Sequence, residues 1–400
     1  MKILFVAMAE SIHTARWINQ ITDQNWGINL FPSKNIDFSH SDLKKLKLHH
    51  FFYCLEDNPG KIEIIGINLY SKILVRNCLR LFEYLFPRYR AKRLAKLIKI
   101  IKPDIIHSME FQHAGYLTYE AKKILGPNFP FPKWIVTNWG SDIYFFGKIA
   151  EDQAKIKQIL KECDFYSCEC NRDVCLAQYY GLKARVLPVF PNSGGIDLKK
   201  FDNFRRKGKT SERKIIVFKG AQSIFGRALV GIQALEKCAK ELQGYKIIIF
   251  SPTEDVVEAA KIFSQKTGIS VSFIPSGVSR TKILKLHGQA RFSLGLNVSD
   301  AISTAVLEAM ALGSFPIQSD SSCAGEWFEN DKTGILVPAE DSEKIAVAIK
   351  KALNNDFLVD QAAKINRQII RQKLDEQKIK QKTINFYKTV YQTNKAESQK

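Results

Sequence analysis

The stretch RFSLGLNVSDAISTAVLEAMALGSFPIQSD, residues 291–320, contains two kinds of secondary-structure pattern. RFSLGLN and SFPIQSD are short apolar runs typical of buried strands, and STAVLEAMAL between them has a helical pattern. A strand, a helix and a second strand in this order are typical of a parallel sheet. The stretch therefore indicates an α/β domain.

Similar apolar runs, separated by helical patterns, occur along the whole chain. They are KILFVAMA, KIEIIGI, DIIHSM, WIVTNW and ARVLPVF in the first half, and KIIVFKG, YKIIIFS and VSFIPS in the second. Short runs rich in Val, Ile and Phe predict parallel sheets with helices on both faces. The opening MKILFVAMAES could also be a short signal peptide, but we interpret it as a first strand because it leads directly into the helical-looking HTARWINQI.

The length of the chain predicts two domains. It has 400 residues, 45% of them hydrophobic, and single cores rarely grow beyond roughly 250 to 300 residues. The polar stretch FPNSGGIDLKKFDNFRRKGKTSERK contains turn residues and charges, which indicate a linker. We expect Rossmann-like, doubly wound domains over residues 1–190 and 191–375, and a C-terminal helix over 376–400 that returns to the N-terminal domain.

Charge and cysteine content narrow the class of protein. Sixty Lys and Arg against forty Asp and Glu give a formal net charge of +20, which indicates an anionic partner. No apolar run reaches the roughly 18 residues of a membrane-spanning helix. The eight cysteines are sparse, as in a cytoplasmic protein with reduced thiols. Four of them lie in CDFYSCECNRDVC without the usual zinc spacing, so we expect no metal there. We expect no cofactor either, because no lysine carries a distinctive cofactor signature.

Two acids flank the predicted helix start in the opening stretch. Asp300 lies in the loop and Glu308 more than one turn into the helix, whose N-cap is Ser303 or Thr304. Such a start presents unpaired backbone N–H groups and a positive dipole end, which suit a diphosphate. Glu308 would then accept hydrogen bonds from a ribose diol. Alternatively, Asp300 is a second capping residue and Glu308 a solvated acid.

These residues resemble a known family. Asp300, seven further residues and Glu308, followed by EAMALGSFP, Glu326 and KTGILVPAED, are similar to the group 1 (family 4) retaining glycosyltransferases of the GT-B fold. The resemblance implies two Rossmann-like domains facing a central cleft and sugar transfer from a nucleotide diphosphate sugar without a metal ion. It also implies that the first acid holds the donor sugar and the second binds the ribose. The first acid is commonly Glu in the family and is Asp here.

A basic pair is expected to bind the donor diphosphate. The family usually carries such a pair after the first strand of its C-terminal domain, and FKGAQSIFGRALVGIQAL offers Lys219 and Arg227. Fixed cations there would offset charge on the departing nucleoside diphosphate. The spacing differs from the commoner GR…KG, and the alternative is two surface cations beside a glycine-rich loop.

The acceptor-side candidates lie in the N-terminal half. KPDIIHSMEFQHAGYLTYEAKK resembles the family segment that supplies a histidine near the transferred sugar. We expect His113, at the helix start, in that role and His107 in a structural one, although either could be a buried, satisfied histidine. Asp142 is expected to cap a helix or else to contact the acceptor. His13 and Arg16 belong to the acceptor site or order their loop.

Residues 72–102 carry much of the positive charge and contain a single acid, Glu83. Within it, Leu94, Leu97, Ile98 and Ile101 recur at helical spacing, which predicts an amphipathic basic helix there. Exposed-looking aromatic residues around Pro87 precede this helix, and such a surface suits an anionic membrane. An ordinary solvated helix is the alternative. Nucleic acid is not expected as a partner. The basic residues of the segment are Lys72, Arg76, Arg80, Arg88, Arg90, Lys92, Arg93, Lys96, Lys99 and Lys102.

Resemblance and charge together predict a function. We expect a retaining, metal-independent hexosyltransferase that acts on a glycan or lipid-linked acceptor in cell-envelope polysaccharide, lipopolysaccharide or glycolipid synthesis. It would be cytoplasmic and bound peripherally to the inner face of the cytoplasmic membrane. The alternatives are a non-catalytic membrane- or polyanion-binding protein with the same fold, and a nucleotide-sugar epimerase or phosphorylase.

Overall fold

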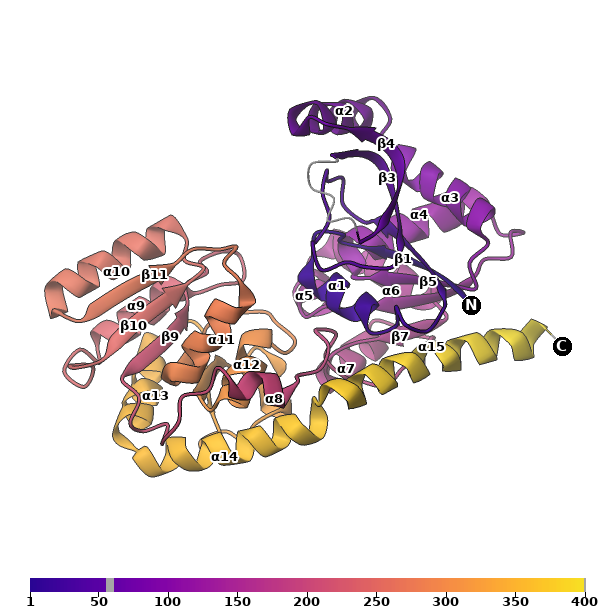
Figure 1. Cartoon of the computed structure of the whole chain (residues 1–400). Coiled ribbons are helices and arrows are strands. Elements are labelled where there is room, and N and C mark those ends of the chain that lie inside the picture. Colours follow the sequence, from indigo (N-terminus) through magenta and orange to yellow (C-terminus); the bar gives the residue numbers. More distant parts are fainter. Residues whose placement is uncertain (55–60, 399–400) are drawn as a thin grey trace. The chain divides into compact units, whose positions relative to one another are not determined.

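The computed structural model describes residues 1–54 and 61–398, which form two compact units (Figure 1). The first unit comprises Met1–Gly195 and Gln377–Lys400, and the second comprises Ile196–Glu376. Each unit contains one sheet in which every described strand pair is parallel, with helices packed against it. The predicted α/β class is confirmed.

The sheet of the first unit has the order β4-β3-β2-β1-β5-β6-β7-β8. β1 pairs with β2 on one side and β5 on the other, and its apolar residues are fully buried, so the opening run is a central strand as predicted. The strands are β1 (Lys2–Ala7), β2 (Gly27–Pro32), β3 (Lys47–Cys54), β4 (Glu63–Leu69), β5 (Ile105–Met109), β6 (Lys133–Thr137), β7 (Phe165–Ser167) and β8 (Arg185–Val186).

Two strands of the first unit differ from the expected strands, which were predicted to have helices on both faces of the sheet. β8 keeps two residues of ARVLPVF, because Pro188 has no amide hydrogen with which to continue a ladder. β4, which contains KIEIIGI, is the edge strand and is mostly exposed. An apolar run in a sequence does not reveal whether a second layer covers it.

The helices of the first unit surround the sheet and include the expected helix after β1. The predicted amphipathic helix is α3, and a second helix, α2, precedes it in the basic segment, with a turn at Pro87 between the two. The helical segments are α1 (Ile12–Asn19), α2 (Lys72–Leu85), α3 (Tyr89–Ile101), the π-helical turn η2 (Phe111–Gly115), α4 (Tyr116–Leu125), α5 (Ser141–Tyr144), η3 (Phe146–Lys148), α6 (Ala150–Glu162), α7 (Asn171–Tyr179) and α15 (Glu376–Ser398).

The last helix, α15, packs on the first unit through buried aromatic side chains. Phe386 and Tyr387 are buried, and the Tyr387 hydroxyl accepts a hydrogen bond from Trp17 Nε1 at 2.6 Å. The same hydroxyl lies 2.7 Å from His107 Nδ1. Residues far apart in sequence thus share one buried polar cluster.

The second unit has the strand order β11-β10-β9-β12-β13-β14. Its strands are β9 (Ile215–Lys219), β10 (Lys246–Phe250), β11 (Ser270–Ile274), β12 (Ala290–Gly295), β13 (Phe315–Ser319) and β14 (Ile335–Val337). Its helices are α8 (Leu198–Asp202), α9 (Ala228–Glu236), α10 (Glu254–Thr267), α11 (Arg280–Gln289), α12 (Thr304–Leu312), η4 (Cys323–Glu326), α13 (Ser342–Asn354) and α14 (Asp356–Lys373).

Strand order reverses once in each sheet. The chain proceeds outward from β9 to β11 and then returns to β12, beside β9, before continuing to β14. In the first unit the same reversal falls between β1 and β5. Ligands of doubly wound sheets bind outside the carboxyl ends of the strands at such a switch point. None of the helices among the described residues is long and apolar enough to cross a bilayer.

Candidate active site

The switch point of the second unit carries a narrow hollow at the carboxyl ends of β9 and β12. Lys219, the last residue of β9, lines it together with Asn297 and with Ser303 at the start of α12. We call this feature the β9–β12 hollow. Two of the predicted donor-binding residues, Lys219 and Ser303, therefore lie beside each other on different elements.

The first turn of α12 is open to an anion. Ser303 is its N-cap, with φ −63° and ψ 126°, and the Ser303 side chain makes no capping hydrogen bond. The first turn contains no acid. Thr304 begins the helix, and backbone N–H groups at this position have no acceptor within a helix. The Ser303 hydroxyl and these N–H groups suit phosphate oxygens.

Glu308 lies on α12 and is 5% exposed, so it is not the solvated acid of the alternative interpretation. Its Oε1 accepts a hydrogen bond from Arg280 Nε at 2.7 Å. Arg280 is the first residue of α11, and its guanidinium lies 5.5 Å from the centre of the Phe201 ring. Sequence reasoning missed Arg280, because 28 positions separate it from Glu308 and no local motif links the two.

Asp300 lies in the loop after β12 and is half-buried. Asn297 Nδ2 donates to Asp300 Oδ2 at 3.2 Å, and Asn297 itself lines the β9–β12 hollow. The backbone N–H of Asn297 donates to Ser319 Oγ at 3.2 Å, which ties this loop to β13. Asp300 is thus held at the border of the hollow through a residue that sequence reasoning did not single out.

Arg227 is engaged with its own loop. Its Nε donates to Glu340 Oε1 at 2.7 Å, and its Nη1 donates to the carbonyl oxygens of Ser223 at 3.0 Å and Gly226 at 3.1 Å. The loop is tightly folded, since a Cβ added to Gly226 would lie 2.0 Å from the carbonyl oxygen of Ala221. Lys219 lines the β9–β12 hollow, whereas Arg227 is not among the described residues that line it.

His107 occupies the structural position expected for it. Its Nδ1 lies 2.7 Å from the Tyr387 hydroxyl and its Nε2 2.6 Å from Thr137 Oγ1. Burial lowers the pKa of His107 to about 3. The ring is therefore neutral near neutral pH, and hydrogen bonds occupy both nitrogens.

His113 lies in η2, just after β5 at the switch point of the first unit. Its side chain is 45% exposed and lines a hollow of about 610 Å³ together with Lys34 and Gln112. We call this the His113 hollow. Burial, and then the nearby Lys34 charge, lower the pKa of His113. A neutral imidazole there can orient a sugar hydroxyl.

Glu110 positions η2 and was not singled out from the sequence. It is buried, and its Oε2 accepts from the backbone N–H of His113 at 2.8 Å while its Oε1 accepts from that of Ala114. Its φ of 130° is rare for a residue with a side chain. Burial raises the pKa of Glu110 to about 7. Strained residues and π-helical turns concentrate at functional sites.

Asp142 is buried in the first turn of α5, where Gly140 is the N-cap. Asp142 Oδ2 accepts from the backbone N–H of Trp139 at 2.8 Å and of Phe111 at 3.1 Å. Burial, and then the charge of Glu110, raise the pKa of Asp142 well above its usual range. Asp142 thus joins the ends of β5 and β6.

The two remaining acceptor-side candidates lie on α1, which follows β1. The His13 ring lies 5.9 Å from the Trp139 ring in an edge-to-face arrangement, and its backbone N–H donates to Ser11 Oγ at 3.2 Å. Arg16 is half-buried one turn further on. A Cβ built on Gly194 would lie 3.8 Å from Arg16 Cβ, so α1 also borders the end of the first unit.

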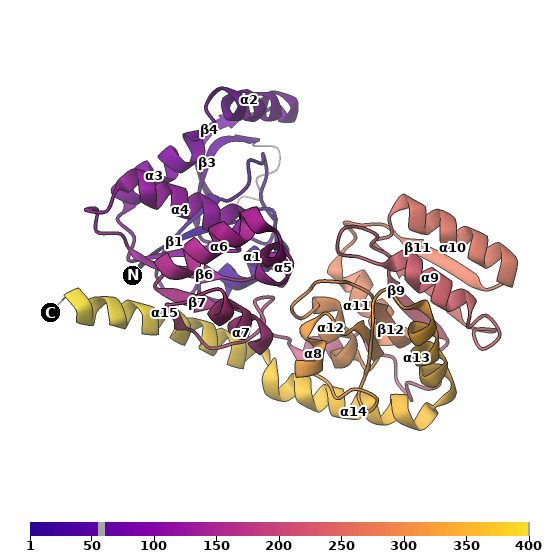
Figure 2. The same cartoon turned by 180° about the vertical axis from the view of Figure 1, so that it is seen from behind.

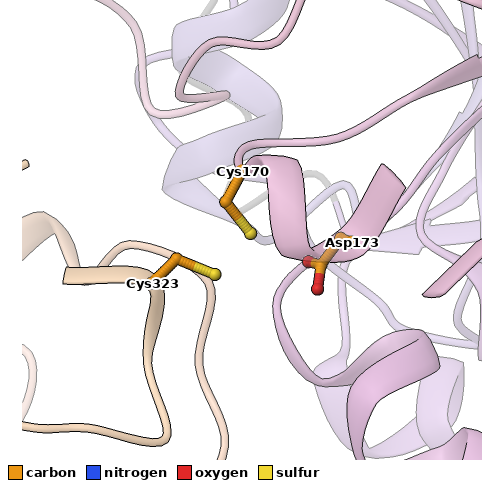
Figure 3. A group of neighbouring side chains, drawn as sticks. All are labelled: Cys170, Asp173 and Cys323. Atoms are coloured by element: carbon orange, nitrogen blue, oxygen red, sulfur yellow. The ribbon is translucent and has the colours of Figure 1, made fainter. Parts of the chain in front are cut away.

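The cysteine-rich segment lies around β7 and α7. Cys163 and Cys168 are buried and Cys175 is exposed on α7. Cys170 precedes α7 and Asp173 lies in its first turn, where Asp173 accepts a hydrogen bond from Asn138 Nδ2 at 2.7 Å (Figure 3). Figure 3 also labels Cys323, which begins η4 in the second unit.

Two family models match the chain and together span most of it. One, described as glycosyl transferase 4-like, matches residues 2–162, and the other, described as glycosyl transferases group 1, matches residues 199–372. The chain belongs to the group 1 glycosyltransferases. The family expected from the acid pair is confirmed.

Solved structures share the fold of this glycosyltransferase. Sucrose-phosphate synthase from Thermosynechococcus elongatus is 14% identical with a TM-score of 0.70, over 98% of this chain and 100% of that one. A glycosyltransferase from Rickettsia africae is 15% identical with a TM-score of 0.63, over 97% and 98%. HepE from Anabaena, in complex with UDP and glucose, is 13% identical with a TM-score of 0.66, over 97% and 100%. The fold is GT-B, as expected, and no curated protein sequence matches the chain.

Proposed function

We propose that this glycosyltransferase moves a sugar from a nucleotide diphosphate sugar to an acceptor hydroxyl, with retention of configuration and without a metal ion. The observation that carries the proposal is the β9–β12 hollow, where Lys219 and the open first turn of α12 meet at the switch point of the second unit. The solved HepE structure, which contains UDP and glucose, supports a nucleotide donor.

Each donor-side residue has a chemical role in this proposal. Lys219, the Ser303 hydroxyl and the N–H groups of the first turn, including that of Thr304, bind the diphosphate. Glu308 accepts a hydrogen bond from a ribose hydroxyl while Arg280 holds its other oxygen. Asp300 accepts hydrogen bonds from the transferred sugar. Arg227 adds positive charge beside the loop after β9.

The proposed reaction needs no protein nucleophile. The acceptor oxygen attacks the anomeric carbon on the face from which the diphosphate departs, the bond between that carbon and the phosphate oxygen breaks, and the acceptor proton passes to a phosphate oxygen. Negative charge grows on the departing diphosphate, and preorganised cations and helix dipoles stabilise such charge strongly. His113 orients the sugar, and His13, Arg16 and Asp142 belong to the acceptor side.

We assign the basic segment 72–102 to an anionic membrane surface. On α2, Ile73, Leu81 and Tyr84 are exposed although they are apolar or aromatic, and each basic residue near an anionic leaflet contributes about 1 kcal/mol. We propose that the reaction belongs to cell-envelope polysaccharide, lipopolysaccharide or glycolipid synthesis at the inner face of the cytoplasmic membrane.

A thermal-shift screen tests the donor site. The full chain is heated with UDP-, GDP-, ADP- and CMP-linked sugars, in buffer containing a chelator. A ligand present at a hundred times its Kd stabilises the native state by about 2.7 kcal/mol, so one nucleotide class is expected to raise the melting temperature clearly. Glu308→Ala is expected to reduce that shift. Vesicle binding without any response to a donor would favour the non-catalytic alternative.

The stereochemistry and the metal requirement are measured on the product. Once a donor is known, NMR of the new glycosidic bond is expected to show the anomeric configuration of the donor, with turnover unchanged by the chelator. An inverted product, or activity that depends on an added divalent cation, would contradict this part of the proposal.

A further inference from the structure

The first unit contains a large apolar cavity at the margin of its sheet. It has a volume of about 990 Å³, and its walls come from β2 (Phe31), β3 (Phe51), β4 (Ile65), α2 (Phe82, Leu85) and α3 (Leu97). Figures 1 and 2 both show α2 beside β3 and the edge strand β4. We call this apolar cavity the edge cavity. A soluble domain rarely leaves this much contiguous apolar surface open unless it binds something there.

Cations line the same cavity. Arg88, Lys92 and Lys96 are exposed and border it along α3 and the turn before it. In the part of the chain that the structure describes, none of the three forms an ion pair with a carboxylate. Arg93 differs from them, because its guanidinium lies 4.9 Å from the centre of the Phe51 ring and donates to the carbonyl oxygen of His50. The edge cavity therefore combines an apolar interior with cations that no described carboxylate pairs.

The edge cavity borders the His113 hollow. Pro87 and Arg88 line both, and the His113 hollow is the more polar of the two, with Lys34, Gln112 and His113 among its lining residues. A single elongated molecule could therefore place a hydrocarbon chain in the edge cavity, an anionic group at Arg88 and a polar head beside His113.

We propose that the edge cavity binds the hydrocarbon chain of a lipid-linked acceptor, that Arg88, Lys92 and Lys96 bind the phosphate of that lipid, and that its sugar-bearing head occupies the His113 hollow. The inference rests on the proposed glycosyl transfer and names the substrate class on its acceptor side. The cavity is a hollow of about 990 Å³ with walls from five elements, so it suits one chain rather than the flat surface of a bilayer. The adjoining cations select an anionic lipid over a neutral one.

Binding of alkyl phosphates to the full chain tests the proposal without a membrane or a donor. Hexyl, octyl and decyl phosphate are titrated calorimetrically below their critical micelle concentrations, beside inorganic phosphate and octanol. Each added methylene is expected to strengthen binding about fourfold, hence about sixteenfold from hexyl to octyl. Affinity that does not change with chain length, or octanol that binds as tightly as octyl phosphate, would overturn the proposal.

Matched variants locate the site. Leu85 and Ile73 both lie on α2 and are 53% and 74% exposed, but only Leu85 lines the edge cavity. Leu85→Glu is expected to weaken octyl phosphate binding at least tenfold, and Ile73→Glu to leave it unchanged. Lys96→Ala is expected to weaken octyl phosphate but not octanol, whereas Lys99→Ala, on the same helix, changes neither. Equal effects within either pair would place the ligand elsewhere.

These experiments distinguish a failure of the lipid-binding proposal from a failure of the proposed glycosyl transfer. Chain-length-dependent binding with no sugar transfer to any lipid phosphate would support the cavity and count against the proposed function. Sugar transfer to a water-soluble acceptor, together with no alkyl phosphate binding, would refute the cavity alone.

Discussion

Replacement of Tyr387 by phenylalanine tests whether the buried cluster around His107 is structural. The lost hydroxyl accepts from Trp17 Nε1 and bonds His107 Nδ1, at 2.6 and 2.7 Å, and all three side chains are fully buried. Each buried polar group left without a partner costs about 1 to 3 kcal/mol. Because two such groups lose their partner, we expect Tyr387→Phe to lower the free energy of unfolding of the first unit by about 2 to 6 kcal/mol.

Calorimetry of the full chain measures this loss. For a unit of this size the melting transition is expected to fall by roughly 4 to 24 °C. Tyr84→Phe removes a hydroxyl from a side chain that is 84% exposed, so its transition should move by less than about 1 °C. Below both transitions, Tyr387→Phe should retain the native rate of sugar transfer. A variant that melts like the native chain, or that loses turnover while still folded, would refute the structural role of His107.

Three further variants examine other parts of the account. The pKa of Glu110 is raised from 4.5 to about 7 by burial, so the native state holds this proton more tightly than the unfolded chain, and its stabilising contribution is lost as pH rises from 4.5 through 7. The melting temperature of the native chain should therefore fall as pH rises over that window, and Glu110→Gln should make this fall smaller. An unchanged pH profile would exclude Glu110 as the cause of the fall. Gly226→Ala should lower the melting temperature of the second unit and weaken donor binding, because the new Cβ meets the Ala221 carbonyl oxygen at 2.0 Å; a native-like calorimetric trace would show that the loop is not constrained. Ile73→Glu should reduce sedimentation with anionic vesicles by at least fivefold, since the negatively charged vesicle surface repels a carboxylate on α2. Full retention on vesicles would place the membrane contact elsewhere.

The fold was largely predictable, because buried parallel strands are short apolar runs that stand out from the helices between them. GINLFP and KLHHFFYC, which form β2 and β3, were not among the predicted strands. His49 and His50 make β3 look polar, yet burial lowers their pKa values to about 4 and about 3, so both are neutral inside the sheet. Polarity in a sequence does not reveal which histidines a fold holds uncharged.

The candidate site was predictable where its residues share one local motif. Asp300, Ser303 and Glu308 all lie after β12 and no further along the chain than the middle of the next helix, and their spacing carries the family resemblance. Arg280 and Glu110 could not be found in this way. Arg280 meets Glu308 through the packing of α11 on α12, and Glu110 acts through a backbone conformation that its neighbours impose. Such partners depend on tertiary structure.

The most direct test of the account is the affinity of the nucleotide donor for a chain in which Lys219 has lost its charge. Calorimetric titration compares the native chain with Lys219→Met and with Lys214→Met, whose lysine lies just before β9 over the Tyr245 ring at 4.6 Å. Loss of one charge-assisted hydrogen bond to the diphosphate should raise the donor Kd about ten- to hundredfold for Lys219→Met. Lys214→Met should bind the donor like the native chain. A Lys219→Met variant with native donor affinity would contradict a diphosphate site at the β9–β12 hollow.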